Sequence, residues 1–191
     1  MKQRPVNHHM RVRSTRLKNF GKDLGSNTIF FTMMSTHDRE KKFKWIGPIG
    51  EGSFSFYKRS DSPFIMNTLD DAKKVACISC RNSGLVYNFL VQAGFKNLDT
   101  TTNPSGIYLK VVNKRCDLAI GETHLGVNYW LKRNKLPTTT LKRIGSPILK
   151  YPLYIAANIN VHDHEIKKWQ TALEQIKKSG EFNKIYKQYE H

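Results

Sequence analysis

The stretch NTIFFTMMSTHDREKKFKWIGP, residues 27–48, decides how the rest of the sequence is interpreted. It opens at 28–31 with β-branched and aromatic residues, a run typical of a buried strand. The Ser-Thr-His-Asp segment at 35–38 is a natural N-cap region and predicts a short basic helical turn. Arg39 would start that turn, where a guanidinium can donate two parallel hydrogen bonds to a carboxylate. Capping of a surface turn is the alternative role for this arginine.

From residue 54 onward, short apolar runs alternate with amphipathic segments. A chain break is predicted at 51–53, with a strand following it at 54–58. Further strands are predicted at 75–79, 95–99, 116–120, 141–146 and 151–157. Helices are predicted at 84–93, 104–113, 122–134 and 162–178, with Gly94 after the first and Pro104 starting the second. This alternation indicates an α/β fold built on a parallel, doubly wound sheet.

The order S-T-x-x-R-E at 35–40, then F-K-W-I-G-P-I at 43–49, resembles a segment of the family 3 extracellular solute-binding proteins. These are the bilobed receptors of polar amino acid ABC transporters, and the resemblance runs from about residue 27 to 189. It implies a periplasmic-binding-protein-like fold of type II, in which two hinge crossings join two α/β lobes. It also implies ligand in the interlobe cleft, transport through a permease partner, and a periplasmic location.

Laid onto this sequence, the resemblance places the crossings near 52–58 and 151–158. Lobe 2 would span 57–151, and lobe 1 would combine 27–56 with 152–191. Family members precede this region with a signal peptide and a β-α-β unit, so we expect lobe 1 to be incomplete. Residues 1–26 are expected to be a poorly ordered basic head, with a short helix near 13–20, too short and polar to replace those strands. No signal peptide is predicted in the sequence as it stands, since no apolar stretch follows the charged N-terminus.

Ligands of open α/β sheets bind beside helix N-termini at the carboxyl ends of strands. Arg39, Arg81 with Ser83, and Glu122 each follow a predicted strand. The resemblance implies that Arg39 binds an α-carboxylate and that Glu122, where an aspartate is usual, binds an α-ammonium. Arg81 stands where the family usually has glycine, and it would favour a second acidic group on the ligand or face solvent.

Three further residues complete the candidate ligand-binding set. The family has a Ser/Thr-rich run where this sequence has Thr32-Met33-Met34, which leaves Thr32 as the main hydroxyl there. Trp45 and Tyr57 offer aromatic faces that could stack on a ligand, and packing in the core or hinge is the alternative for Trp45. These departures from the family leave the identity of the solute open.

Composition sets limits on other functions. With 32 Lys and Arg against 15 Asp and Glu, the 191 residues carry a net charge of +17, which makes a nucleic-acid-binding protein an alternative. The basic residues are scattered as pairs outside the head, as on a solvated surface. No phosphate-binding loop, dinucleotide fingerprint or nucleophile elbow is present, so we expect no enzyme activity and no cofactor.

The cysteines and histidines indicate no metal site. Cys77 and Cys80 form a C-x-x-C in an apolar run, without the second pair that a zinc site needs, and Cys116 lies in another run. We predict buried cysteines within strands, at least one of them unpaired. The sequence thus predicts a monomeric, non-catalytic protein that binds a small polar, amino acid-like solute. A remnant that no longer binds ligand is a further alternative.

Overall fold

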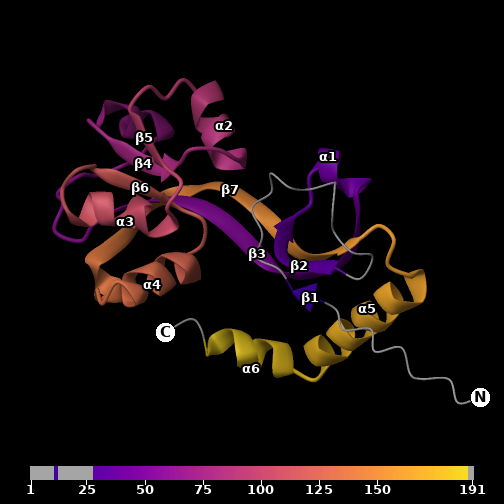
Figure 1. Cartoon of the computed structure of the whole chain (residues 1–191). Helices are drawn as coiled ribbons and strands as arrows, with labels where there is room; N and C mark the ends of the chain where they lie inside the picture. Colours follow the sequence, from indigo (N-terminus) through magenta and orange to yellow (C-terminus); the bar gives the residue numbers. More distant parts are fainter. Residues whose placement is uncertain (1–10, 13–27, 189–191) are drawn as a thin grey trace, which may run out of the picture. The chain divides into compact units, whose positions relative to one another are not determined.

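The computed structural model describes residues 11–12 and 28–188 (Figure 1). Strands and helices alternate along most of this chain, as predicted, and the fold is mixed α/β. The strands are β1 (Arg11–Val12), β2 (Thr28–Met34), β3 (Phe43–Arg59), β4 (Ile78–Arg81), β5 (Leu98–Thr101), β6 (Leu118–Gly121) and β7 (Leu141–Asn158). The α-helices are α1 (His37–Glu40), α2 (Leu85–Gln92), α3 (Pro104–Val112), α4 (His124–Arg133), α5 (Asp163–Lys178) and α6 (Glu181–Lys187). Two 3₁₀ helices, η2 (Leu69–Lys74) and η3 (Thr138–Thr140), complete the described elements.

The described strands are hydrogen-bonded in the order β1-β2-β7-β3-β6-β4-β5. The chain divides into two compact units, and the long strands β3 and β7 each contribute to both. Unit 1 takes its described residues from Met1–Glu51 and Tyr151–His191, and unit 2 comprises Gly52–Lys150.

Unit 2 is built on a parallel core of three short strands. Ile78 of β4 lies beside Leu98 of β5 on one side and Leu118 of β6 on the other, and both pairings are parallel. All four residues of β6 are buried, as expected for a parallel strand covered on both faces. β3 adds to β6 in the antiparallel direction, so the parallel, doubly wound core carries an antiparallel strand and the sheet is mixed.

Helices cover both faces of the sheet of unit 2. Tyr57 of β3 packs with Ile107 and Tyr108 of α3 and with Val127 of α4, which places α3 and α4 on one face. The preceding residue, Phe56, points to the opposite face of the sheet. Its ring stacks on Phe95, which follows α2, at a centroid distance of 6.3 Å. Alternate residues of one strand therefore anchor the two helical layers.

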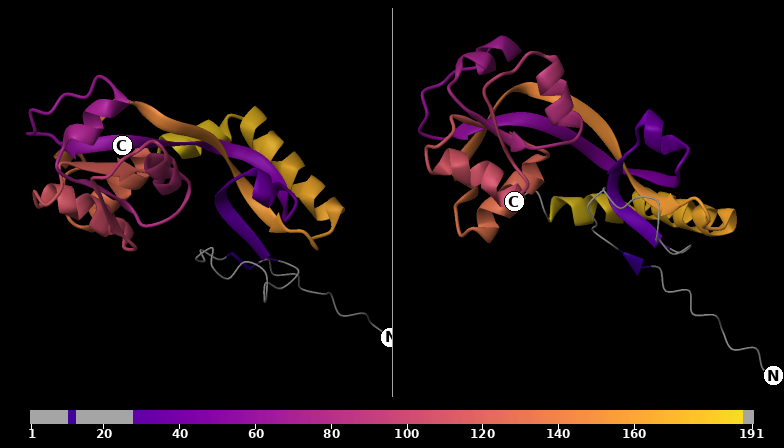
Figure 2. Two further views of the ribbon diagram at one scale, coloured as in Figure 1. Left: turned by 90° about the horizontal axis from the view of Figure 1, so that it is seen from above. Right: turned by 45° about the horizontal axis from the view of Figure 1, so that its top comes forward.

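Unit 1 has a sheet of its own with one long helix against it. β2 pairs antiparallel with β7, and its register shifts between Phe30 and Met33, where Thr32 adopts a left-handed φ of 54°. Helix α5 lies along one face (Figure 2), packing Ile166, Trp169 and Leu173 on apolar residues of β2, β3 and β7. The predicted amphipathic helix is thus confirmed.

The described part of the basic head contributes one short strand to unit 1. Arg11–Val12 pairs in parallel with Thr28 and Ile29 of β2. The helix predicted near 13–20 lies outside the described residues. Helix α6 has no buried residue, and Ile185 on it is 46% exposed. α6 makes its principal contacts with α5, which leaves its outer face uncovered by the described chain.

The predicted chain break at 51–53 does not exist. β3 runs unbroken from Phe43 to Arg59, and the two strands predicted at 141–146 and 151–157 form the single strand β7. β3 and β7 are neighbours in the sheet. Their backbone amides and carbonyls therefore have hydrogen-bond partners even where the side chains do not alternate between apolar and polar.

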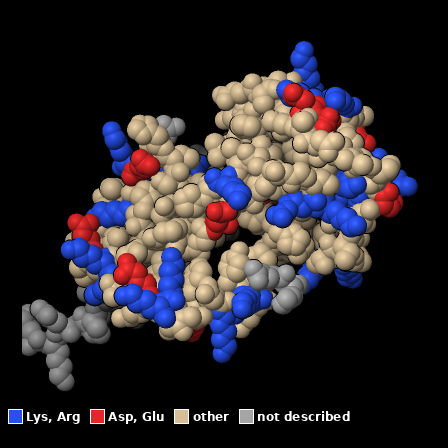
Figure 3. All heavy atoms as spheres, turned by 180° about the vertical axis from the view of Figure 1, so that it is seen from behind, with Lys and Arg blue, Asp and Glu red and all other residues tan. Residues whose placement is uncertain are grey.

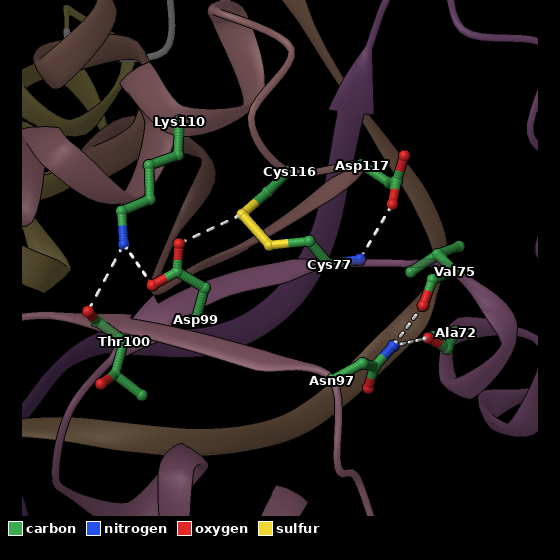
Figure 4. Close-up of a disulfide and its surroundings, with 9 residues drawn as sticks. All are labelled: Ala72, Val75, Cys77, Asn97, Asp99, Thr100, Lys110, Cys116 and Asp117. Carbon is green, nitrogen blue, oxygen red and sulfur yellow. Dashed lines mark hydrogen bonds and ion pairs between the residues drawn. A yellow bond between two sulfur atoms is a disulfide. The ribbon is translucent and has the colours of Figure 1, made fainter.

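The cysteines are arranged differently from the prediction. Cys77 and Cys116 lie just before β4 and β6 and form a disulfide (Figure 4). Cys80, within β4, is free and buried. The two parallel strands place these residues side by side, since the amides of Asp117 and Leu118 both donate to the Cys77 carbonyl at 2.9 and 3.2 Å. Sequence spacing could not reveal this pairing because 39 residues separate the cysteines.

Candidate functional site

Two oppositely charged side chains meet where the central parallel strands of unit 2 end. Arg81 is the last residue of β4, and Glu122 directly follows β6. Because β4 and β6 are parallel neighbours, both residues emerge at the same edge of the sheet. Nη1 of Arg81 lies 3.7 Å from Oε1 of Glu122, and the side chains are 44% and 51% exposed. This carboxyl edge of unit 2, with Arg81, Ser83 and Glu122, is called the unit 2 site below.

The loop from β4 to α2 is held by backbone contacts and leaves its side chains in solvent. The amide of Asn82 donates to the carbonyl of Thr101 at 3.2 Å, which joins this loop to the end of β5. Gly84 is the N-cap of α2, with a left-handed φ of 105° that favours glycine. A Cβ at Gly84 would meet no atom within 4 Å. Ser83 beside it is exposed and available to a solute.

The loop from β6 to α4 holds Glu122 by two contacts that the sequence analysis missed. Thr123 is the N-cap of α4, and its Oγ1 accepts a hydrogen bond from the Gly126 amide at 2.9 Å. The buried hydroxyl of Tyr108 bonds to the backbone of Glu122. Burial, and next the charge of Glu122, raise the pKa of Tyr108 far above its usual value, so this hydroxyl stays protonated. A threonine before a helix is a recognisable sequence signal, whereas nothing in the sequence identifies Tyr108.

Tyr57 does not line the unit 2 site. Its side chain is 1% exposed and packs inside the core, where burial raises the pKa of its hydroxyl. The ring lies against Gly121, the residue just before Glu122, since a methyl group there would come within 2.6 Å of Cε2 of Tyr57. The proposed stacking of Tyr57 on a ligand is therefore wrong, because the helices α3 and α4 cover the face of β3 from which it projects.

The remaining candidates lie in unit 1. Arg39 belongs to the four-residue helix α1 behind the N-cap Thr36, as the sequence predicted, and its Nη1 donates to the Met34 carbonyl at 3.4 Å. Thr32 is exposed at the irregularity of β2. Trp45 is half-buried and contacts Phe43 and Tyr154 edge to face, at centroid distances of 5.9 and 5.7 Å. The packing role that was the alternative for Trp45 accounts for these contacts.

One group of residues in the described chain has metal-ligand chemistry. The ligand atoms of Cys77, Asp99 and Cys116 lie within 4.8 Å of one another. The two sulfur atoms are bonded to each other, and the Asp99 carboxylate pairs with Lys110 Nζ at 2.6 Å (Figure 4). A disulfide has no thiolate that could bind a cation, so this group of residues stabilises the fold.

Basic side chains do not form one continuous patch on the face drawn in Figure 3. On the face drawn in Figure 3, Lys and Arg lie in separate groups, several of them next to Asp or Glu. Ion pairs account for some of the charge, among them Lys44–Asp163 and Lys168–Glu165. Within the described residues, no helix is long and apolar enough to cross a membrane.

Comparisons of sequence identify no relative, because no family model and no curated protein matches the chain. Comparisons of structure do identify similar proteins. A histidine kinase sensor domain with similarity to periplasmic binding proteins aligns with a TM-score of 0.69 and 17% identity, over 85% of this chain and 69% of that one.

Amino acid-binding proteins align equally well. An arginine transport periplasmic binding protein from Legionella pneumophila gives a TM-score of 0.66 and 21% identity, over 84% of this chain and 72% of that one. An ancestral amino acid-binding protein, a precursor of cyclohexadienyl dehydratase, gives 0.67 and 20% identity, over 86% and 70%. The chain therefore has the fold of periplasmic binding proteins, whose members with solved structures include amino acid-binding proteins and substrate-binding proteins of transporters.

Proposed function

We propose that this chain is a non-catalytic binding protein for a small polar solute, an amino acid or a similar molecule. The observation that carries the proposal is the Arg81–Glu122 pair, which offers both signs of charge at the carboxyl edge of a parallel sheet. A zwitterion is best recognised by such a pair, since each of its charges loses water on binding and requires a partner. The shared fold with amino acid-binding proteins supports the same class of ligand.

The proposed contact residues of unit 2 are Arg81, Ser83 and Glu122. Thr32, Arg39 and Trp45 stay candidate contact residues within unit 1. We further propose delivery of the solute to an ABC transporter permease by a monomer outside the cytoplasm. The Cys77–Cys116 disulfide supports that location, because disulfides persist mainly in oxidising compartments.

A thermal-shift screen tests the proposal. The full chain is melted against single amino acids and other small polar solutes, with Glu122→Gln and Arg39→Ala measured in parallel. A ligand that binds only the folded state must raise the melting temperature. We expect a rise with one class of solute that is diminished in Glu122→Gln. A cooperative melt that no solute shifts would refute solute binding.

A further inference from the structure

We infer that reduction of the Cys77–Cys116 disulfide creates a site in unit 2 for a thiophilic divalent cation such as Zn²⁺. The ligands are the two cysteine thiolates and the carboxylate of Asp99, whose ligand atoms lie within 4.8 Å of one another. Sequence spacing indicated no metal site, because the third ligand comes from the separate strand β5. This site goes beyond solute binding and does not depend on it.

The spacing of the ligand atoms fits a tetrahedral ion. Zinc binds thiolate sulfur at about 2.3 Å and carboxylate oxygen at about 2.1 Å, so two such ligands at a tetrahedral angle lie about 3.6 Å apart. Oδ2 of Asp99 lies 3.7 Å from Sγ of Cys116 (Figure 4). The Cα atoms of Cys77 and Cys116 are 4.6 Å apart. Rotation about the two Cα–Cβ bonds can therefore place the freed sulfur atoms about 3.8 Å apart, as two zinc ligands require.

The backbone around the cysteines is held by hydrogen bonds that do not involve the disulfide. The Cys77 amide donates to Oδ2 of Asp117 at 2.9 Å, and the Cys77 carbonyl accepts from the amides of Asp117 and Leu118. The Cys116 amide donates to the Lys110 carbonyl at 3.1 Å. These contacts keep the two cysteines next to each other when the bond between their sulfur atoms is broken.

Lys110 supports the third ligand. Its ammonium donates to Oδ1 of Asp99 at 2.6 Å, which fixes the carboxylate while Oδ2 faces Cys116. Carboxylates that bind metals are in turn hydrogen-bonded by a second group in this way. The charges also balance, because the three negative charges of two thiolates and a carboxylate meet a divalent cation and the Lys110 ammonium.

Binding at this site is switched by the redox state of the cysteines. A dithiol reductant transfers two electrons and two protons to the disulfide and is itself oxidised to a disulfide, which leaves two thiols on the protein. The thiol protons pass to water when the cation binds, since thiolates are the ligands. The cation has access from solvent, because the Asp99 side chain is 48% exposed and Cys77 is partly exposed.

The test compares the oxidised and the reduced full chain. Dithiothreitol reduces the protein and is then removed by gel filtration under argon, because a free dithiol would itself bind the metal. Zn²⁺ is titrated by calorimetry, and Co²⁺ by absorption, in which thiolate ligands give a charge-transfer band. Asp99→Asn and Cys77→Ser remove ligands. As controls, Asp70→Asn removes an exposed carboxylate of η2, and Cys80→Ala removes the cysteine that lies outside the ligand group.

One Zn²⁺ should bind the reduced chain at least about 10-fold more tightly than any Zn²⁺ binds the oxidised chain, and Co²⁺ should show the thiolate band. Asp99→Asn should weaken binding by at least about 10-fold, since even loss of a group that only hydrogen-bonds a ligand costs about 10- to 100-fold. Cys77→Ser should abolish the difference between the two redox states. Asp70→Asn and Cys80→Ala should match the reduced parent.

Equal binding by the oxidised and reduced chains would overturn the inference, as would binding that Asp99→Asn leaves unchanged or that Cys80→Ala abolishes. If the reduced chain unfolds, Zn²⁺ must restore its circular dichroism spectrum, because a metal that binds only the folded state drives folding. Failure to restore the spectrum would also overturn the inference. Solute binding is measured on the oxidised chain, so none of these results decides the proposed function.

Discussion

Gly121→Ala should destabilise unit 2 more than any other single methyl addition near the unit 2 site. Gly121 ends β6 and is buried directly before Glu122. A Cβ at this position would lie 2.5 Å from Cγ2 of Val127 and 2.6 Å from Cε2 of Tyr57. Both neighbours are 1% exposed, so neither can turn into solvent to make room.

The magnitude follows from the two contacts. Distances below about 3 Å force the strand or α4 to move, and one methyl group too many in a packed core costs about 1–3 kcal/mol. Two simultaneous contacts from fully buried side chains place this case near the upper value. With an m-value of about 2 kcal/mol per molar urea, the unfolding midpoint should fall by roughly 1–1.5 M.

Urea-induced unfolding followed by circular dichroism measures this change. Gly106→Ala is the matched control, because the nearest atom to its Cβ would be Thr101 Oγ1 at 3.3 Å and α3 gains a better helix former. It should be neutral or slightly stabilising. A loss below about 0.5 kcal/mol in Gly121→Ala, where surface substitutions usually fall, would refute the packing argument.

A second variant isolates the cause. Val127→Ala alone removes two buried methyl groups and should cost about 2 kcal/mol. Combined with Gly121→Ala, it also removes the closer of the two clashes. The double variant should therefore lose less than the sum of the single losses, since the two residues are in contact. Additive losses would show that the methyl group does not press on Val127.

Three other predictions concern the cysteines and one ion pair. Replacing both Cys77 and Cys116 by serine should lower the free energy of unfolding by about 4 kcal/mol in the chain-entropy description of a closed loop of this length, and reduction of the parent should give the same loss in urea titrations. Burial raises the pKa of the Cys80 thiol to about 11, so iodoacetamide at pH 8 should label it only after unfolding; rapid labelling of the native chain, read by mass spectrometry, would contradict its burial. The Lys44 ammonium, 2.5 Å from Asp163, lowers the pKa of the Asp163 carboxyl. The stability that this ion pair contributes is therefore present above the ordinary aspartate pKa and is lost as pH falls through the lowered value. Asp163→Asn should reduce the loss of melting temperature with falling pH, measured between about pH 2 and 6.

Local signals predicted the helices well. Pro104 at the first turn of α3 and Gly94 after α2 mark helix boundaries through backbone constraints that a single residue imposes. Strand continuity failed at residues 51–53 because the partner that sustains β3 there is β7, about a hundred residues further along the chain. Pairings of that kind are not encoded by neighbouring residues.

For the candidate site as well, local sequence signals predicted some features, and features that depend on distant parts of the chain were missed. The sequence analysis selected Arg81 and Glu122 because each follows a predicted strand, and the structure places their charged groups 3.7 Å apart. Their roles in binding stay predictions. The environment of Tyr57 was predicted wrongly because the side chain of a strand residue can project from either face of the sheet. Whether that face is open to a ligand depends on which helices cover it. The Cys77–Cys116 bridge likewise depends on which strands are neighbours.

The unbroken course of β3 and β7 has a consequence for how such a protein can be rearranged. Unit 2 is one uninterrupted stretch, Gly52–Lys150, that leaves β3 and returns on β7, two strands that are hydrogen-bonded neighbours. Its two ends are therefore close enough to be joined by a short linker, or to be inserted into a loop of another protein. Such a rearrangement would keep the Arg81–Glu122 pair and the Cys77–Cys116 disulfide together, because all four residues lie within this one stretch.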